Sequence, residues 1–344
     1  MSEIDKIAKI TDRAGTGAPN FTNGFTIAGV DSGITAFTHT EGSTEPSNPS
    51  NGDTWWDTGN DAYYVRMNDA WKQWLGADTS FSGPAYMGTR GIIAGGYGSG
   101  SAHAEDIQYI TIATPGNATD FGDLAAAFYY GTSCSDGTRA FSFGGYNNST
   151  ATLLNNIQQT VIATTGNATD VGDISVPSYF NASLSNATRA VCAVGRTREN
   201  ATSGSFSYVN TMEYITTASA GNSTDFGDQT DSKGLLAACS DSTRGLFAGG
   251  SDASSVRTDT IDYITIQTAG NAADFGDLSQ TNNRNSACAN ATRGVIGGGF
   301  TVTGSVSRVN TIEYVTIQSP GNATDFGDLA AINYGLAAFS GSPS

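Results

Sequence analysis

The stretch Thr243-Arg244-Gly245-Leu246-Phe247-Ala248-Gly249-Gly250 decides the fold, because related copies of it occur five times along the chain. Each copy opens on a Thr-Arg pair. A polar gap, a segment rich in Ile and Tyr, and a Gly-Asn pair with two aspartates follow. Both pairs recur about every 50 residues, a period that indicates a propeller, a solenoid or another array. The arginines are Arg90, Arg139, Arg189, Arg244 and Arg293, and the asparagines are Asn117, Asn167, Asn222, Asn271 and Asn322.

The clearest repeat predicts four short strands. Residues 234–239 and 245–250 are apolar runs separated by a polar turn, residues 260–266 are mixed, and residues 274–278 are short and edge-like. Two apolar inner strands and a solvated outer strand are typical of a propeller blade. Short strands between turns rich in Gly and Asn favour an all-β class.

The order of these residues resembles the kelch repeat. In that family an apolar strand leads to a Gly-Gly doublet, followed by a Tyr-centred strand and a short last strand with an aromatic residue. The resemblance covers residues 84–344 and implies a five-bladed β-propeller. The second repeat departs from it at Gln159 and Val171, and the third has Val194-Gly195 as its doublet. The matching residues are Gly95-Gly96, Gly144-Gly145, Gly249-Gly250, Gly298-Gly299, Tyr109, Tyr214, Tyr263, Tyr314, Phe121, Phe226, Phe275 and Phe326.

The end of the chain predicts that this propeller is closed. Residues 334–340 match residues 234–240, the first strand of a blade, whereas no clear apolar strand precedes Arg90. We therefore expect the C-terminal strand to complete the first blade, which leaves no unpaired blade edge.

A separate aromatic module, residues 46–80, precedes the repeats and holds all four tryptophans of the chain. A linker composition covers residues 41–52, and three strands are expected at 54–57, 62–67 and 71–75. The order Gly-Asp-x-Trp-x-Asp-Thr-Gly, Tyr-Val-Arg, Trp resembles a small module of phage tail-fibre and virion proteins. That resemblance implies a spacer with a packed aromatic core. The alternative is carbohydrate binding through Trp55, Trp56, Trp71 and Trp74.

The N-terminal segment, residues 1–45, is expected to dock into a larger assembly. A short helix would place Ile4, Ile7 and Ile10 along one side, and a helix this short orders only against a partner. The run Gly15-Thr16-Gly17-Ala18-Pro19-Asn20-Phe21 resembles the N-terminal segment of many phage tail-fibre proteins. This resemblance implies docking to other virion proteins through Ile4, Ile7, Ile10 and Phe21.

The charge balance narrows the class of partner. The chain has 32 acidic residues against 16 Lys and Arg, a net charge of −16. Nucleic acid and anionic membrane surfaces are therefore excluded as expected partners, because phosphate binding needs clustered cations. No apolar run is long enough to insert into a membrane. Four free thiols are expected, since Cys134, Cys239 and Cys288 hold one apolar repeat position and Cys192 lies out of step with them.

The sequence offers no catalytic set, so we expect a protein that is not an enzyme. Five arginines at one repeat position favour a scaffold role over anion binding, since an active site is normally asymmetric. The paired aspartates after Gly-Asn fit capped turns. A structural calcium ion is the alternative there, and no other cofactor or metal is expected. His39 and His103 lie in polar segments without metal-ligand spacing.

The connections after the doublets differ between repeats, which is how propellers present binding surfaces. The longest connection, residues 196–210, supplies the candidate binding residues Arg196, Arg198, Phe206 and Tyr208. The competing interpretation is simple insertion tolerance in exposed loops.

The resemblances together imply a bacteriophage virion protein, a tail, fibre or neck component and a homo-oligomer in the particle. Such a protein would bind another virion protein, or a protein or glycan of the host surface. The alternatives are a glycan hydrolase or lyase of the tail-spike type and an intracellular kelch scaffold.

Overall fold

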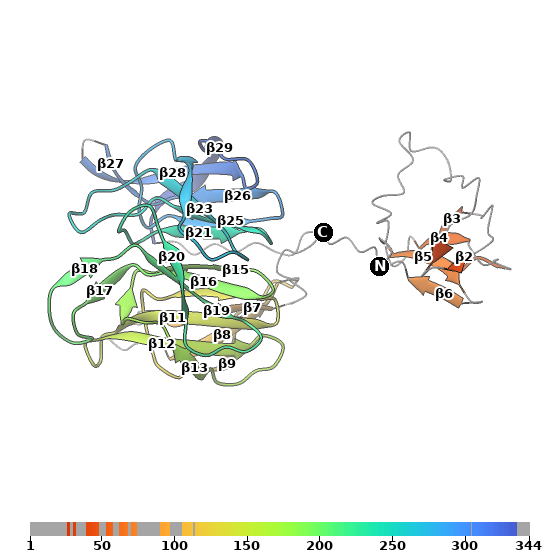
Figure 1. The fold of residues 1–344 in the computed structure, drawn as a ribbon, viewed down its shortest axis with the longest axis horizontal. Helices are drawn as coiled ribbons and strands as arrows, with labels where there is room; N and C mark the ends of the chain where they lie inside the picture. Colours follow the sequence, from red (N-terminus) through yellow and green to blue (C-terminus); the bar gives the residue numbers. More distant parts are fainter. Residues whose placement is uncertain are drawn as a thin grey trace. The chain divides into compact units, whose positions relative to one another are not determined.

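The computed structural model describes residues 26–27, 30–31, 39–47, 53–57, 62–67, 70–73, 90–96, 105–112, 114–303 and 305–335. The chain divides into two compact units, Met1–Thr79 and Ser80–Ser344. Over these described ranges the chain forms strands and turns and no helix, so the predicted all-β class is confirmed (Figure 1). The described residues accordingly include no helix suited to crossing a membrane.

The first unit contains the aromatic module. A sheet of order β3-β4-β5-β6 includes the three predicted strands, and the bounds differ from the prediction at β6. The fourth strand, β3, was not predicted. It pairs in parallel with β4 and overlaps the first two residues of the expected linker. The strands are β1 (Thr26–Ile27), β2 (Val30–Asp31), β3 (His39–Gly42), β4 (Thr54–Asp57), β5 (Ala62–Met67) and β6 (Ala70–Gln73).

Trp55 forms the centre of this module. Its side chain is buried and stacks on Tyr64 with ring centroids 5.1 Å apart. Its indole N–H donates to the carbonyl of Gly42 at 2.9 Å, which ties β3 to β4. Packing, rather than an exposed ligand platform, is therefore the role of Trp55.

The second unit holds five successive antiparallel sheets, which we call repeats I to V. Repeats II to IV have four strands each, and repeat I has three described strands. The strands of repeats I and II are β7 (Arg90–Ala94), β8 (Asp106–Thr111), β9 (Thr119–Asp123), β10 (Thr132–Ser135), β11 (Arg139–Asn147), β12 (Thr152–Val161) and β13 (Thr169–Asp173). Those of repeat III are β15 (Ala182–Ser185), β16 (Arg189–Ala193), β19 (Thr211–Thr216) and β20 (Thr224–Asp228). Those of repeats IV and V are β21 (Ala237–Ser240), β22 (Arg244–Ala248), β23 (Thr260–Thr265), β24 (Ala273–Asp277), β25 (Ser286–Ala289), β26 (Arg293–Gly297), β28 (Ser305–Thr316) and β29 (Thr324–Asn333).

Three short strands stand outside this plan. They are β14 (Ser178–Tyr179), β17 (Arg196–Arg198) and β18 (Phe206–Tyr208), and they form a small sheet of their own in the order β14-β17-β18. A further strand, β27 (Phe300–Thr303), makes a hairpin with the first half of β28 in repeat V.

Neighbouring repeats pack face to face through buried apolar residues. Each of the four contacts, I with II through IV with V, has its own hydrophobic cluster. The repeat phenylalanine joins three of them, as Phe121, Phe226 and Phe275 are 3%, 2% and 3% exposed. These clusters place the core between the sheets.

The Gly-Asn turns fasten each repeat to the one before it. The Asn167 side-chain oxygen accepts the backbone N–H of Asp123, and Asn222, Asn271 and Asn322 repeat this contact. A glycine is needed opposite the turn. Gly227 has φ +133°, and a Cβ there would lie 2.5 Å from the carbonyl carbon of Gly270.

The two outer faces of the five-repeat array remain exposed. Phe326 of repeat V is 55% exposed, although its phenylalanine counterparts in repeats I, III and IV are buried. On repeat I, Ile93 is 49% exposed, whereas the residues at its position in repeats III to V are buried. The described residues thus form four inter-sheet contacts and not five. Most of the expected closing strand, residues 336–340, lies outside them.

A series of backbone hydrogen bonds, which we call the backbone chain, also links repeats II to V. It runs through the residue with positive φ just before the first strand of each of these repeats and ends at Gly335, which follows β29 and also has positive φ. The N–H of Phe180 donates to the carbonyl of Tyr130, Leu235 to Phe180, Arg284 to Leu235 and Gly335 to Arg284, at 2.8 to 3.1 Å. Non-glycine residues with positive φ are costly, so this chain is a built feature at one end of the repeat unit.

Candidate functional site

The five repeat arginines are built into the scaffold. Their guanidinium carbons lie 4.4 to 4.6 Å from the ring centres of Tyr109, Tyr214, Tyr263 and Tyr314 in four repeats. Arg189 also donates to the carbonyl of Ile266 at 3.2 Å, and Arg244 donates to that of Ile317 at 2.9 Å. Both acceptors belong to the next repeat. Arg189 and Arg244 thus cap strands of the next repeat, which agrees with the scaffold role expected from the sequence.

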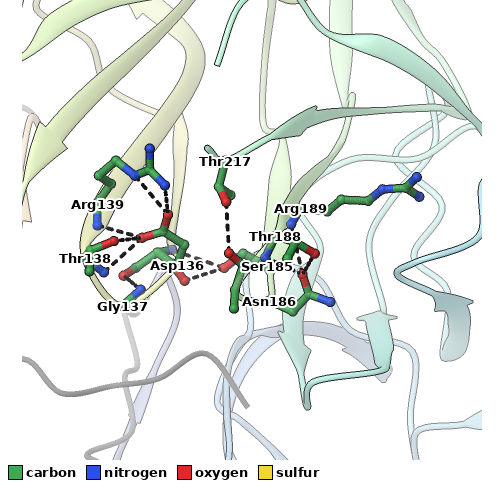
Figure 2. A network of polar contacts seen from close by, with 11 residues as sticks. Asp136, Gly137, Thr138, Arg139, Ser185, Asn186, Thr188, Arg189 and Thr217 are labelled. Carbon is green, nitrogen blue, oxygen red and sulfur yellow. Dashed lines mark hydrogen bonds and ion pairs between the residues drawn. The ribbon is translucent and has the colours of Figure 1, made fainter. Parts of the chain in front are cut away.

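Repeat II shows what happens when the ring is missing. Gln159 stands where the tyrosine is expected, and Arg139 pairs instead with Asp136 at 2.8 Å. Figure 2 shows the Asp136 carboxylate turned onto the Thr138 and Arg139 backbone N–H groups, which donate at 2.9 and 2.7 Å. Burial acts to raise the pKa of Asp136, but these hydrogen bonds and those from the Thr138 hydroxyl and Arg139 guanidinium lower it below 3.8.

The Asp136 turn recurs with an uncharged residue. Asn186 in repeat III accepts the Thr188 and Arg189 backbone N–H groups at 3.0 and 2.9 Å through its side-chain oxygen, as Figure 2 also shows. The same contacts form at Asp241 and Asn290. The side-chain oxygen, and not its charge, is therefore what this turn requires.

The aspartates after Gly-Asn act as turn caps. The side chains of Asp170, Asp225, Asp274 and Asp325 each accept the backbone N–H of the glycine two residues on, at 3.2 Å. Over the part of the chain that the structure describes, no three metal-binding side chains gather. Structural calcium therefore gains no support from geometry and stays untested.

Buried acids at one repeat position hold the connections between repeats. Glu213 accepts the backbone N–H of Ser175 at 2.9 Å, and Glu313 accepts that of Ser279 at 2.8 Å. Asp262, at the same position, instead faces Lys233 with the two charges 3.0 Å apart and both side chains almost wholly buried. This row could not be recognised in the sequence, because three acids do not stand out among 32.

The cysteines are free thiols, as expected. Burial raises the pKa of Cys134 and of Cys239 to about 12, and it also raises that of Cys192. Thiols with such pKa values stay protonated at neutral pH and are poor nucleophiles.

The predicted binding residues come together at the other end of the repeats. The second strand of each repeat starts at the Thr-Arg arginine and ends at the glycine doublet, so the doublets and their connections lie at the opposite end. Arg196 and Arg198 lie on β17, which pairs with Phe206 and Tyr208 on β18. The segment expected to be a loop is therefore a β-hairpin.

The ring of Phe206 holds both guanidiniums. The Arg196 and Arg198 guanidinium carbons lie 4.2 and 3.7 Å from its centre. Arg196 also donates to the hydroxyl of Tyr179 at 2.9 Å. Burial raises the pKa of Tyr179, and the nearby Arg196 charge opposes that rise. Tyr208 has a partly structural role, because a Cβ on Gly234 would lie 2.9 Å from its ring.

Further aromatic residues adjoin this hairpin. Tyr179 lies 4.2 Å from Phe180 between ring centres, and Phe180 lies 4.8 Å from Tyr130. Tyr130 is 48% exposed. Tyr146 occupies the same repeat position as Arg196, directly after the doublet, and its ring centre is 6.0 Å from that of Tyr179.

Repeats IV and V carry a second group of the same kind. Phe300, at the Arg196 position of repeat V, lies 5.1 Å from Tyr334 between ring centres. The guanidinium carbon of Arg257 lies 5.0 Å from the Phe300 ring. Those of Arg284 and Arg308 lie 5.7 and 4.9 Å from the Tyr334 ring.

Both groups lie at the end of the repeat unit where the inter-repeat hydrogen bonds of the backbone chain run through Tyr130, Phe180 and Arg284. We call this surface the arginine–aromatic face. The sequence analysis found only its hairpin. The predicted docking residues Ile4, Ile7, Ile10 and Phe21 lie outside the described residues. The face consists of Tyr130, Tyr146, Tyr179, Phe180, Arg196, Arg198, Phe206, Arg257, Arg284, Phe300, Arg308 and Tyr334.

Comparison with known proteins establishes the fold alone. The solved structure of YjhT matches with a TM-score of 0.61 and 11% sequence identity, over 73% of this chain and 84% of YjhT. A likeness at this identity shows a shared fold and carries no information about activity. No family model matches the sequence, and no curated protein matches it.

Proposed function

We propose that this chain is a non-catalytic binding protein of a bacteriophage particle, a tail, fibre or neck component. Its repeats form a five-bladed kelch-like propeller that displays the arginine–aromatic face. One observation carries the binding role. Residues that differ between repeats gather at one end of the repeat unit, whereas residues that recur in every repeat make contacts within the fold. Binding sites are expected where a repeated scaffold varies.

The composition of the face supports binding rather than catalysis. A glycan hydrolase or lyase of the tail-spike type would need clustered carboxylates out of repeat register. The described face carries guanidiniums and rings instead. Incubating the protein with host polysaccharide should release no new reducing ends, and their release would contradict this part of the proposal.

Closure of the propeller is supported by its two exposed faces. Ile93 and Phe326 occupy positions that are buried at the contacts between repeats, so apposing repeats V and I would form a fifth contact of the same kind. In this proposal residues 336–340 add the first strand of repeat I. The closed ring would then leave neither apolar face in water.

Two matched substitutions test closure. Phe226→Ala removes a buried ring and should cost about 3–5 kcal/mol. If the ring closes, Phe326→Ala should cost nearly as much, measured as the shift in urea midpoint. A cost under about 1 kcal/mol would show that Phe326 stays exposed and that the array is open.

Assembly into the particle rests on the N-terminal segment. It would dock to other virion proteins through Ile4, Ile7, Ile10 and Phe21, as a homo-oligomer, without nucleic acid, membrane insertion or a cofactor. Mass spectrometry of purified particles should detect the chain, and a variant with Asp at Ile4, Ile7 and Ile10 should be missing from them. Absence of the wild-type chain from particles would overturn the assignment to a virion.

A further inference from the structure

We propose that the arginine–aromatic face binds an acidic polypeptide segment of a partner protein. This inference names the ligand class of the binding role proposed above and rests on it. Five arginines lie on the face, none of them at the repeat-arginine position: Arg196, Arg198, Arg257, Arg284 and Arg308.

None of these five guanidiniums forms an ion pair with a carboxylate of the described residues. The ion pairs there join Arg139 to Asp136 and Lys233 to Asp262. Acidic residues outnumber Lys and Arg two to one in the sequence, 32 to 16. Five arginines without an ion pair among the described residues of so acidic a protein favour an anion supplied by a partner.

The guanidiniums of the hairpin are held in place with a terminal nitrogen left for a ligand. Stacking on Phe206 fixes both planes. Arg196 donates through Nη1 to the Tyr179 hydroxyl at 2.9 Å, and Arg198 donates through Nη1 to the Thr202 carbonyl at 3.3 Å. Among the described contacts Nη2 of each arginine makes no hydrogen bond, and a fixed guanidinium with a free terminal nitrogen suits binding of a carboxylate.

The packing of the rings favours a polypeptide over an acidic glycan. A sugar stacks on an exposed ring face. Phe206 is occupied by two guanidiniums and Tyr334 by those of Arg284 and Arg308. Tyr179 and Phe180 pack on each other. Rigid, mutually packed Tyr, Phe and Arg side chains without exposed lysine are the composition of a protein-binding hot spot.

The face is also broad enough for an extended segment. In Figure 1 the strands β17 and β18 of repeat III and β27 of repeat V lie toward the same side of the repeat unit. The backbone chain through Phe180, Leu235 and Arg284 connects the two arginine groups. A peptide that crosses this end would meet Arg196 and Arg198 first and then Arg284 and Arg308.

The test is a titration of the full chain with a fluorescein-labelled peptide of alternating aspartate and glycine, followed by anisotropy. The peptide should bind, and the double variant R196Q/R198Q should weaken binding by about tenfold or more. The matched control is Arg293→Gln, which removes one charge at the opposite end and should leave the affinity within about twofold. An alternating asparagine–glycine peptide should not bind.

Each other outcome overturns the proposal. No binding of the aspartate peptide, or equal affinity for wild type and R196Q/R198Q, removes the acidic ligand. A polyuronate oligosaccharide of matched carboxylate number that binds more tightly than the peptide, and loses affinity in R196Q/R198Q, assigns the face to an acidic glycan. Circular dichroism confirms that the variants remain folded. Because none of these results depends on the particle, a failure here leaves the virion assignment standing.

Discussion

The two ends of the repeat unit use arginine in opposite ways. At the Thr-Arg end, Arg244 stacks on Tyr263 and donates to a carbonyl of the next repeat, so its guanidinium binds within the fold. At the doublet end, Arg198 stacks on Phe206 and donates to the Thr202 carbonyl at 3.3 Å, both within its own hairpin, so its contacts tie no repeat to the next. In our proposal the same residue type is scaffold where every repeat keeps it and binds a ligand where only one repeat has it.

This difference teaches that repetition itself separates the two roles. A contact between neighbouring repeats must be made at every boundary, so its residues recur. A binding surface is needed once. Repeat II supports this view. Gln159 replaces the tyrosine there, and Arg139 forms an ion pair with Asp136 of its own turn instead.

Among the arginines, the largest expected effect is on stability at the Thr-Arg end. Arg244→Gln removes a stacked guanidinium and a charged hydrogen bond, and should cost about 2–4 kcal/mol. Arg198→Gln makes the same change of charge at the other end and should cost about 1 kcal/mol or less. Urea midpoints followed by circular dichroism measure both. Equal shifts would erase the distinction between the two ends.

A smaller effect should appear in binding when a ring is removed. Phe206→Ala frees the guanidiniums of Arg196 and Arg198, so affinity for the aspartate–glycine peptide should fall about tenfold, or about 1.4 kcal/mol. Phe300→Ala frees Arg257 alone and should have a weaker effect. If Phe206→Ala binds as well as wild type, ring-held guanidiniums are not what the peptide recognises.

The smallest effect is a pH dependence at Asp136. Its pKa is lowered in the folded protein, so its charge contributes stability above the unfolded pKa of about 3.9, and that contribution is lost as pH falls through the folded value. Asp136→Asn keeps the turn, as Asn186 shows, and removes about 1 kcal/mol or less at neutral pH. The gap between wild type and variant should close in acid. A gap that is equal at both pH values would show that the charge plays no part.

Much of the fold could be predicted because the apolar runs and turn residues that define each repeat lie within a few positions of one another. The strand at Arg244–Ala248 and the strand at Thr260–Thr265 match their predicted runs within two residues. Apolar runs and turn residues act over a few positions, which a sequence displays directly. The parallel strand β3 was missed because His39–Gly42 is polar and its pairing depends on β4, more than ten residues away.

The candidate face could be predicted only in part. Arg196 and Phe206 stood out because one long connection holds both. Arg284 and Tyr334 were missed because Arg284 precedes β25 and Tyr334 follows β29, both far from that connection in sequence, and only the backbone chain reveals their shared end. One signal was present: every arginine of the repeat region outside the five repeat positions lies on this face.

The most direct test is a ¹H–¹⁵N spectrum of the arginine Nε–H groups in the full chain during titration with the aspartate–glycine peptide. It observes both classes of arginine at once, with assignments from single Arg→Gln variants. We predict that the resonances of Arg196 and Arg198 shift with saturation while those of Arg189 and Arg244 stay fixed. Shifts at Arg189 and Arg244, or none at Arg196 and Arg198, would contradict the division between scaffold and binding arginines.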